Sequence, residues 1–440
     1  MDPLRRAAVE LLMEWEKRGS KLDPLFFRRT QGLGPRERGF VRELVYGVVR
    51  WLLRLDHVIA QHSKVKPQRM ERAVLAALRV GAYQLLFLDQ VPPWAAVSEM
   101  VEVVKGMGKG QAAGFVNAVL RAIAEGGKGK LPDREEKPRE YLSIAFSHPG
   151  WVVEGWLKRW GLQETERLCA ANNLIPPLTI RVNTLLGERE ELLGRLALEG
   201  RRAYPTPYSP WGLILQDEEG FTKSELFKEG WFQVQDEGAQ LISMLLSPEP
   251  GERVLELCAA PGGKATHMAQ MMGGRGEVVA VDISPEKLSL LKENCRRLRI
   301  TNVKAERYDA RGPLPFSPES FDRVLVDAPC TGLGVLRRNP DGKWRVKEED
   351  VKRLSELQFE ILQEGARMLK RGGVLLYSTC TLTREENEGV VERLLEKGDF
   401  QLLEPPLSLP PSFFTQEGHF LSLPHRHGTD GFFAALLKKS

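Results

Sequence analysis

The sequence predicts three structured parts: an all-α bundle, a small α+β subdomain and an α/β domain built on a doubly wound sheet. Three observations predict them. Apolar residues recur at helical spacing over residues 1–125, short helix and strand patterns mix over 141–233, and strands alternate with helices over 234–440. A chain of 440 residues also exceeds the size of one ordinary core, so several domains are expected.

The bundle is predicted to contain five helices. In the first, Asp2 can cap the N-terminus, Pro3 suits the first turn and Gly19 ends the helix. The others are predicted at 39–51, 72–86, 95–105 and 112–124. Residues 126–140 are rich in glycine and charge and have little to bury, which predicts a linker.

The later parts are predicted from their alternation of element types. In the α+β subdomain, helix patterns cover 151–160, 164–172 and 188–199, and strand patterns cover 178–183 and 212–216. In the α/β domain, strands are predicted at Arg253–Leu257, Glu277–Asp282, Val303–Arg307, Phe321–Asp327, Gly373–Ser378 and Phe432–Lys438. Its helices are predicted at Lys264–Met272, Pro285–Leu298, Val351–Leu369 and Arg384–Leu395. Ligands of such sheets bind at the carboxyl ends of the strands, so the residues that follow the strands are the candidate site.

Charge is distributed unevenly along the chain. Residues 1–130 hold 22 Lys and Arg against 13 Asp and Glu, a charge of +9, so the remainder carries −5 of the net +4. A basic first segment indicates a polyanionic partner, and a plain solvated face is the alternative. No apolar run is long enough to span a bilayer and the N-terminus lacks a signal peptide, so no membrane partner and a cytoplasmic location are expected.

Two thiols follow predicted strands. Cys330 ends the string Asp327-Ala328-Pro329-Cys330, and Cys380 ends Ser378-Thr379-Cys380. The chain has an odd number of cysteines, five, and no two of them have C-x-x-C spacing. Neither a disulfide framework nor a structural zinc site is therefore expected. His425-x-His427 lies beside a glycine-rich turn and is interpreted as a solvated loop, so no metal is expected. Two thiols at the carboxyl-terminal edge of one sheet indicate a catalytic pair.

A small-residue turn after the first strand of the α/β domain indicates a nucleotide site. It consists of Cys258, Ala259, Ala260, Pro261, Gly262, Gly263 and Lys264, and a helix begins within it. The turn matches neither a Walker A loop nor the G-x-G-x-x-G fingerprint. Asp282 follows about twenty residues later, where a carboxylate can bind ribose hydroxyls, and Asp309 at the next strand end could reach the base. The turn by itself fits NAD as well as S-adenosylmethionine.

The thiols favour S-adenosylmethionine, because hydride transfer does not need them. Carbon 5 of a pyrimidine is a poor nucleophile until a thiolate adds to carbon 6, which is covalent catalysis. Asp327 is placed to assist near N3 of the base, and a cation such as Lys264 would favour the thiolate. The residues alone leave open which thiol attacks.

The chain resembles RNA cytosine-5 methyltransferases in three strings: Ala260-Pro261-Gly262-Gly263-Lys264, Asp327-Ala328-Pro329-Cys330-Thr331-Gly332 and Ser378-Thr379-Cys380. Arg181-Val182-Asn183-Thr184, Gln235-Asp236-Glu237-Gly238-Ala239 and Asp430-Gly431-Phe432-Phe433 fit the same family. Its basic helical segment resembles the NusB antitermination domain, which within that family marks the bacterial 16S ribosomal RNA enzyme of the RsmB (Sun/Fmu) type.

The resemblance implies a fold, a reaction and residue roles. The domain from residue 234 is expected to be a Rossmann-like methyltransferase domain that binds S-adenosylmethionine. Cys380 is implied as the nucleophile and Cys330 as the thiol that assists release. Residues 258–264 with Asp282, Asp309 and Asp327 are implied to line the cofactor site. The expected partner is 16S ribosomal RNA with a flipped or unpaired target base, and a monomer is expected.

Three alternatives stay open at this point. One is a non-catalytic NusB-like RNA-binding or antitermination factor, another is a methyltransferase acting on a different RNA such as tRNA, and the third is a nicotinamide-dependent oxidoreductase. A cationic loop also follows the first thiol and is predicted to grip phosphates and stack a base, with a plain exposed loop as the alternative. It contains Arg337, Arg338, Lys343, Trp344 and Arg345.

Overall fold

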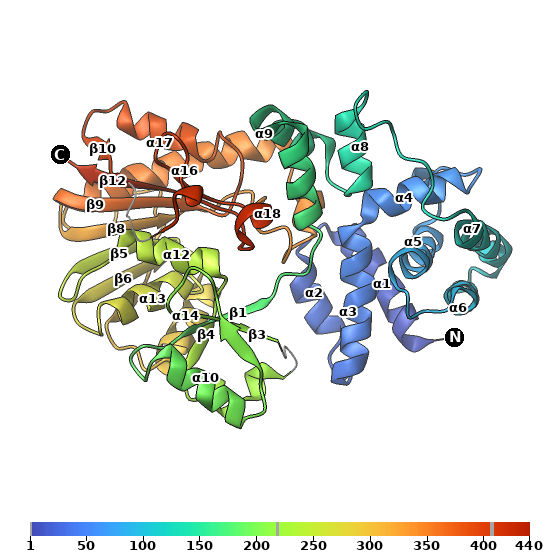
Figure 1. Cartoon of the computed structure of the whole chain (residues 1–440), viewed down its shortest axis with the longest axis horizontal. Coiled ribbons are helices and arrows are strands. Elements are labelled where there is room, and N and C mark those ends of the chain that lie inside the picture. The colour runs from blue at the N-terminus through green and yellow to red at the C-terminus, as the bar shows by residue number, and fades with distance from the viewer. Residues whose placement is uncertain (1, 217–219, 405–408) are drawn as a thin grey trace. The chain divides into compact units, whose positions relative to one another are not determined.

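The computed structural model describes residues 2–216, 220–404 and 409–440. Its internal contacts form two compact units. One contains Met1–Leu174 and Leu336–Val346, and the other contains Ile175–Val335 and Lys347–Ser440. In Figure 1 the helices of the first unit up to residue 171 are blue to green, and the large sheet of the second unit runs from yellow to red. Each unit is described by itself below.

The first unit is helical in the part that the structure describes. Its helices are α1 (Pro3–Arg18), α2 (Leu22–Arg29), α3 (Pro35–Arg50), α4 (Leu52–Gln61), α5 (Arg72–Phe87), α6 (Pro93–Gly106), α7 (Ala113–Gly126), α8 (Pro138–Ala145) and α9 (Gly150–Ala171). Asp2 caps α1 by accepting the Leu4 N–H at 2.8 Å, and Gly19 ends it with a φ of 59°. α5 is buried from Ala73 to Gln84 on every side, because apolar residues surround it, and it forms the centre of the bundle.

The grouping of helices differs from the segments expected from the sequence. Helices α8 and α9 cover stretches that the sequence analysis places in the α+β subdomain, yet they belong to the helical unit. Gly161 has a φ of 72° and breaks α9, which agrees with the two helix patterns predicted there. The periodicity of apolar side chains predicts a helix, but it does not show which unit the apolar face of that helix packs against. The sequence therefore could not place α8 and α9 in the helical unit.

The stretch between α7 and α8, expected as a linker, is held against α4. Arg54 Nη2 donates to the Lys128 carbonyl at 2.6 Å, and Gln61 Nε2 donates to the Lys130 carbonyl at 2.8 Å. Neither helix nor strand forms between Gly127 and Lys137. The glycine-rich segment therefore has an irregular backbone, as expected, but side chains of α4 hold that backbone by hydrogen bonds.

The segment 336–346 returns to the helical unit and does not form an open cationic loop. The Lys343 ammonium group is 1% exposed and donates to the Arg50 carbonyl (3.2 Å), the Ser147 carbonyl (3.1 Å) and Asn173 Oδ1 (2.7 Å). Trp344 Nε1 donates to the Val49 carbonyl at 2.7 Å. The expectation that Lys343 grips a phosphate is wrong, because Lys343 is buried and its ammonium group is used by internal hydrogen bonds. Stacking of a base on the partly buried Trp344 stays a prediction.

The α+β part of the second unit is a four-stranded antiparallel sheet in the order β2-β3-β1-β4. Its strands are β1 (Leu178–Val182), β2 (Ala203–Pro205), β3 (Gly212–Leu215) and β4 (Phe232–Val234). Helices α10 (Arg189–Leu198) and α11 (Glu225–Lys228) accompany it. Ile180, Leu192, Leu213 and Phe232 form part of its apolar core.

The α/β domain has the predicted sheet, in the order β10-β12-β9-β8-β5-β6-β7, with β11 paired to β12. Strands β5 (Arg253–Leu257), β6 (Glu277–Asp282), β7 (Val303–Arg307), β8 (Phe321–Asp327) and β9 (Leu369–Thr379) are parallel. The antiparallel strands are β10 (Phe400–Leu402), β11 (Phe420–Ser422) and β12 (Phe432–Lys439). This confirms the α/β fold class predicted from the alternation of strands and helices.

Helices cover both faces of this sheet. One face packs against α12 (Glu237–Leu246), α13 (Gly263–Met271) and α14 (Pro285–Arg297), through residues such as Leu241, Met268 and Leu291. The other packs against α16 (Glu348–Met368) and α17 (Glu388–Leu395), through residues such as Leu362 and Val390. Of the short helices, α18 (Pro424–His427) belongs to this unit, whereas α15 (Gly342–Arg345) belongs to the helical unit.

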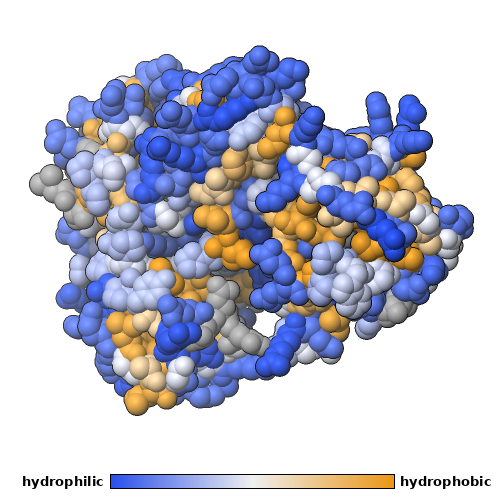
Figure 2. All heavy atoms as spheres, turned by 45° about the vertical axis from the view of Figure 1, so that its right-hand side comes forward, coloured by the Kyte–Doolittle hydropathy of each residue, from blue (hydrophilic) through white to orange (hydrophobic). Residues whose placement is uncertain are grey.

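No helix in the described residues is both long and apolar enough to cross a membrane. On the face shown in Figure 2, hydrophilic side chains predominate and apolar side chains form patches between them. Large exposed apolar side chains include Leu198 (91% exposed), Trp94 (74%) and Ile175 (67%). Exposed apolar surface therefore occurs in both units.

Arg181 of β1 joins the small sheet to α13 within the second unit. It is fully buried, and its guanidinium donates to the Gly263 carbonyl at 2.7 Å, to Gln270 Oε1 at 3.1 Å and to Thr266 Oγ1 at 3.1 Å. Burial lowers the pKa of Arg181 to about 9. The small sheet thereby holds the carbonyl at the start of α13.

Replacing Arg181 with methionine is expected to lower the free energy of unfolding by about 3 kcal/mol, because four acceptors, Gln235 Oε1 among them, lose their donor. Urea denaturation followed by circular dichroism measures the loss. Arg353→Met is the control: Arg353 is 66% exposed and pairs with Asp350 on the surface of α16. That change is expected to cost less than about 1 kcal/mol, and equal losses in both variants would contradict a special role for the buried network.

Candidate active site

Four adjacent parallel strands end at one edge of the large sheet. The register pairs Leu257 of β5 with Val281 of β6 and with Val326 of β8, and pairs Asp327 of β8 with Ser378 of β9. The residues that follow these strands therefore meet at this edge. They are the sequence-predicted turn 258–264, Asp282, Asp327, Cys330 and Cys380.

The structure brings the two predicted thiols together. Cys330 Sγ and Cys380 Sγ are 3.3 Å apart, and the Gly334 N–H donates to the Cys380 carbonyl at 2.9 Å. The hydrogen bond to Cys380 and burial together raise the pKa of Cys330 well above its ordinary value. Cys330 therefore keeps its proton at neutral pH.

A buried ion pair lies at the same edge. Lys264 Nζ is 2.6 Å from Asp327 Oδ2, and the Ser378 hydroxyl donates to Asp327 Oδ1 at 2.9 Å. Burial alone would lower the pKa of Lys264, but the Asp327 carboxylate raises it, and the lysine stays above its ordinary value. Cys380 is among the groups that raise this pKa, so the ammonium ion lies near the thiol pair. Such a cation favours the thiolate form of a cysteine.

The predicted nucleotide turn has a backbone suited to close ligand approach. Cys258 has a φ of 61° and Gly262 a φ of 95°, and a Cβ at Gly262 would lie 2.7 Å from the Leu291 side chain. Helix α13 begins directly after this glycine, and N–H groups in the first turn of a helix have no partner within the helix. Asp282 Oδ2 accepts the Ala260 N–H at 3.1 Å, which joins the turn to the end of β6.

Glu256 of β5 lies beneath this turn and was not found from the sequence. It is 1% exposed, and its Oε2 has no hydrogen-bond partner in the described residues. Burial raises the pKa of Glu256 well above its ordinary value, and the charge of Asp327 raises it further. The sequence did carry a signal for Glu256, because it is a glutamate inside the otherwise apolar run Val254-Leu255-Glu256-Leu257, and a glutamate within a buried strand is unusual.

The donor set at this edge fits S-adenosylmethionine. A buried polar oxygen without a partner, a carboxylate at the end of β6 and the N–H groups at the start of α13 could bind an amino acid group and ribose hydroxyls. S-adenosylmethionine would be held by the turn 258–264 together with Glu256, Asp282 and Asp327.

Asp309 is not joined to the other predicted site residues by a hydrogen bond that the structure shows. It follows β7, and its carboxylate accepts Arg311 Nη2 at 2.5 Å and Arg311 Nε at 3.0 Å. This hydrogen bonding lowers the pKa of Asp309. A role of Asp309 toward the base therefore stays a prediction.

A second residue missed from the sequence, Glu386, ties the two thiol loops together. Its Oε1 accepts the Thr331 backbone N–H at 2.9 Å, and its Oε2 accepts the Thr331 hydroxyl at 2.6 Å. The hydroxyls of Thr331 and Thr381 are 2.6 Å apart, and the Thr381 hydroxyl is 3.3 Å from Glu386 Oε2. Glu386 is fully buried, so one carboxylate fixes the residue that follows each thiol.

Neighbouring side chains complete this network. Gln358 of α16 donates to Glu386 Oε1 at 3.0 Å and to the Pro329 carbonyl at 2.9 Å, while Asn387 Nδ2 donates to the Thr381 carbonyl at 3.1 Å. The sequence analysis placed Glu386 in a helix from Arg384, but α17 begins at Glu388. The glutamate consequently lies in a turn and points inward. Charged residues before a helix are common, so nothing in the sequence distinguished this one.

The solvated loop expected at His425-x-His427 is wrong for His427, which is 6% exposed and lies at the end of the short helix α18. The His427 ring stacks on Phe413 with ring centres 4.0 Å apart, and its Nε2 lies 3.1 Å from the Ser412 carbonyl. Burial lowers the pKa of His427 to about 4. Within the described ranges, no group of three His, Cys, Asp or Glu side chains is arranged to hold a metal ion.

Family models match three parts of the chain. Residues 243–438 match a model described as 16S rRNA methyltransferase RsmB/F. Residues 2–125 match the NusB family, and residues 148–221 match the ferredoxin-like domain of RsmF/B-like methyltransferases.

Relatives of similar length span the whole chain. The chain is 37% identical to probable ribosomal RNA small subunit methyltransferase B of Bacillus subtilis, over 99% of this chain and 98% of the relative. It is 38% identical to the protein of the same description in Synechocystis, over 99% of each. Among solved structures, PH0851 is 30% identical with a TM-score of 0.82 over 100% of this chain and 99% of that one. NSun6 from Pyrococcus horikoshii with SFG is 26% identical with a TM-score of 0.59, over 66% of this chain and 98% of that one.

Proposed function

The chain belongs to the ribosomal RNA small subunit methyltransferase B family, and on that premise we propose that it methylates carbon 5 of a cytosine in 16S ribosomal RNA. One observation carries the choice of carbon 5. Two thiols lie 3.3 Å apart beside a buried lysine–aspartate pair, at the edge where the sheet binds ligands. Carbon-5 chemistry needs a thiol nucleophile, which methylation of an amino group does not.

S-adenosylmethionine, when bound at 258–264, Glu256, Asp282 and Asp327, supplies the methyl group as a sulfonium electrophile. The chain's own residues prepare the base. Cys380 attacks carbon 6 as a thiolate, a carbon–sulfur bond forms there, and the electron pair moves to carbon 5. Lys264, paired with Asp327, favours that thiolate by its charge, and Asp327 assists near N3 of the cytosine.

Cys330 assists the release step. After methyl transfer, carbon 5 must lose its proton so that the carbon–sulfur bond can break and Cys380 can leave as a thiolate. The hydrogen bond to Cys380 is the first cause of the raised pKa of Cys330. When the sulfur of Cys380 is bonded to carbon it can carry no negative charge beside Cys330, which removes one cause of that raised pKa. Cys330 then gives its proton to solvent, and its thiolate accepts the proton of carbon 5. The electron pair of that C–H bond forms the C5–C6 double bond, and the C6–S bond breaks with Cys380 leaving as a thiolate.

The cofactor role of Asp282 has a direct test. Asp282→Asn is expected to weaken S-adenosylmethionine binding about tenfold, because a charged acceptor for ribose hydroxyls becomes a neutral amide. Isothermal titration calorimetry measures the affinity. Asp309→Asn is the comparison: a small effect is expected because Arg311 occupies that carboxylate, and a tenfold loss would show that Asp309 turns toward the cofactor.

The proposed substrate has its own test. Bisulfite sequencing of 16S ribosomal RNA from cells with and without the gene is expected to show one cytosine position that loses methylation. Loss at a tRNA position, with 16S RNA unchanged, would assign the activity to the other RNA. No change at any RNA, together with no cofactor binding, would favour the non-catalytic RNA-binding factor.

The organisation that accompanies this function is also proposed. Residues 1–125 bind RNA as a NusB-like domain, 126–140 connect it to the subdomain 141–233, and 234–440 carry the catalysis. The protein acts as a monomer in the cytoplasm. The net charge of +9 over residues 1–130 supports an RNA-binding role for the first part.

A further inference from the structure

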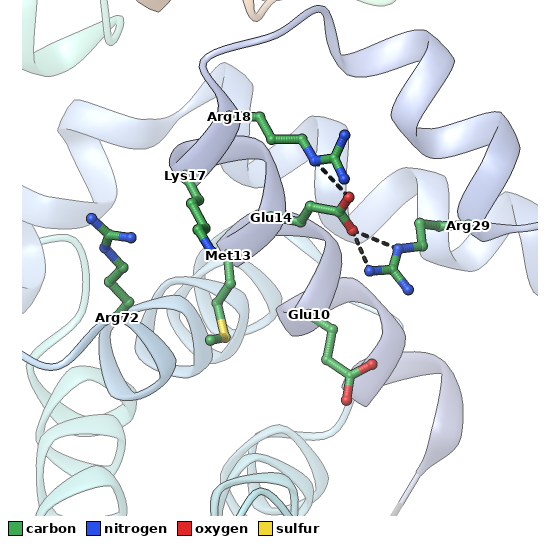
Figure 3. Close-up of a pocket in the computed structure, with 7 residues that line it drawn as sticks. All are labelled: Glu10, Met13, Glu14, Lys17, Arg18, Arg29 and Arg72. Atoms are coloured by element: carbon green, nitrogen blue, oxygen red, sulfur yellow. Dashed lines mark hydrogen bonds and ion pairs between the residues drawn. The ribbon is translucent and has the colours of Figure 1, made fainter.

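The helical unit has an open pocket of about 550 Å³ lined almost entirely by charged side chains. Figure 3 shows it between α1 and its neighbours α2 and α5. Four of the seven described residues that line it are cations, namely Lys17, Arg18, Arg29 and Arg72. This pocket lies outside the thiol site and has no role in the mechanism above.

One carboxylate organises three of the arginines at this pocket. Glu14 accepts Arg18 Nε at 2.8 Å, Arg28 Nη2 at 2.8 Å and Arg29 Nε at 2.6 Å. The Glu14 side chain is 12% exposed, whereas the three arginine side chains are 52%, 52% and 53% exposed. A single negative charge therefore holds three guanidinium groups in place, and each keeps N–H donors on its exposed side.

Two further cations add positive charge that no carboxylate neutralises in the described part of the chain. Lys17 and Arg72 are exposed, and the structure shows no ion pair for either. In Figure 3 they lie on the side of Met13 away from Arg29. Counting Arg28 with the lining residues, five cations face Glu10 and Glu14, which leaves a surplus of three positive charges.

This arrangement suits phosphodiester groups. Guanidinium groups bind phosphate oxygens through paired hydrogen bonds, and pre-ordered arginines lose less side-chain entropy on binding. Met13 is the apolar member of the described lining, and no aromatic side chain is present in that lining to stack a base. The pocket is thus suited to contact a backbone without reading its sequence.

We propose that this pocket binds phosphates of the RNA backbone at a site separate from the methylated cytosine. The inference rests on the proposed function, since that function makes RNA the substrate. The pocket increases the affinity for RNA and positions the RNA on the protein. Loss of the pocket should therefore raise KM and leave kcat unchanged.

The test uses the full chain and a fluorescein-labelled 16S ribosomal RNA fragment. The pocket variant is the triple substitution Lys17→Gln, Arg29→Gln and Arg72→Gln. The matched control removes three exposed cations elsewhere on the same unit: Lys64→Gln, Lys105→Gln and Arg121→Gln. Fluorescence anisotropy is measured at several salt concentrations, and thermal melting checks that both variants are folded.

The pocket variant is expected to bind RNA about 30-fold more weakly at 100 mM salt, with a salt slope about two units shallower, because two or three phosphate contacts are lost. The control is expected to lose less than about threefold through its reduced overall charge. Methylation by the pocket variant at saturating RNA should proceed at the wild-type rate. Equal losses in both variants, or none in the pocket variant, would overturn the proposal.

Two other outcomes are informative. If polyglutamate competes with RNA as well as unlabelled RNA does, and the pocket variant loses polyglutamate binding, the pocket binds an acidic protein and the proposal is overturned. If the wild-type protein methylates no RNA, the proposed function fails, whereas normal methylation with unchanged RNA affinity of the pocket variant defeats only the pocket assignment.

Discussion

Replacing Cys330 with alanine is expected to leave the protein covalently bonded to its RNA, while replacing Cys380 with alanine should form no bond at all. The Cys330 variant can still attack carbon 6 through Cys380, but it lacks the group that accepts the carbon-5 proton. The Cys380 variant lacks the nucleophile, so its methylation rate should fall at least about a thousandfold. A denaturing gel with radiolabelled RNA shows the adduct as a band of reduced mobility.

Cys295→Ala is the control for this pair, because Cys295 lies on α14 and is not part of the thiol contact. It should methylate at nearly the wild-type rate and accumulate no adduct. If the Cys380 variant forms the adduct and the Cys330 variant does not, the two roles are reversed. Because either thiol can donate the hydrogen bond that joins Cys330 and Cys380, the adduct experiment decides between these two roles.

Changing Glu386 to glutamine is expected to lower kcat about a hundredfold, because small displacements of reacting groups cost that much. One carboxylate oxygen becomes an amide nitrogen, which cannot accept a hydrogen bond. In place of Oε1 it loses the Thr331 N–H and Gln358, and in place of Oε2 it loses the Thr331 and Thr383 hydroxyls. The loops that carry the two thiols then lose a common anchor. The free energy of unfolding should also fall by about 2 kcal/mol.

Glu385→Gln is the matched control, because Glu385 is the preceding residue and is exposed. It should change kcat less than about twofold and stability by less than about 0.5 kcal/mol. Positioning is separated from simple destabilisation by measuring the rate of adduct formation in a Cys330→Ala background, at a temperature where both proteins are fully folded. A normal adduct rate with Glu386→Gln would contradict the positioning role.

Much of the fold follows from local sequence patterns. Strands β5 to β8 begin and end at the predicted residues, because each is a short apolar run bounded by turn residues. β9 begins at Leu369, before the predicted Gly373, because Leu369 pairs with Phe321 of β8 ahead of an irregularity in the register. Helix α2 (Leu22–Arg29) and α4 (Leu52–Gln61) were not predicted, and each is short or directly follows another helix.

The sequence could predict those site residues that directly follow a predicted strand, because the ends of parallel strands meet at one edge of the sheet. Cys330, Cys380, Asp327, Lys264 and Asp282 all lie at the expected edge of the sheet. The remaining parts depend on long-range contacts that periodicity does not encode. Glu386 acts on a residue 55 positions earlier, and Lys343 bonds to a carbonyl 293 positions earlier.

The covalent bond between the protein and the base is tested most directly with RNA made from 5-fluorocytidine. Fluorine at carbon 5 cannot leave as a proton, so the wild-type protein with S-adenosylmethionine should remain attached after one methyl transfer. Digestion and mass spectrometry should then find the methylated fluorocytidine on the peptide that contains Cys380. Attachment at Cys330, or an intact protein that releases methylated product without any adduct, would contradict the account.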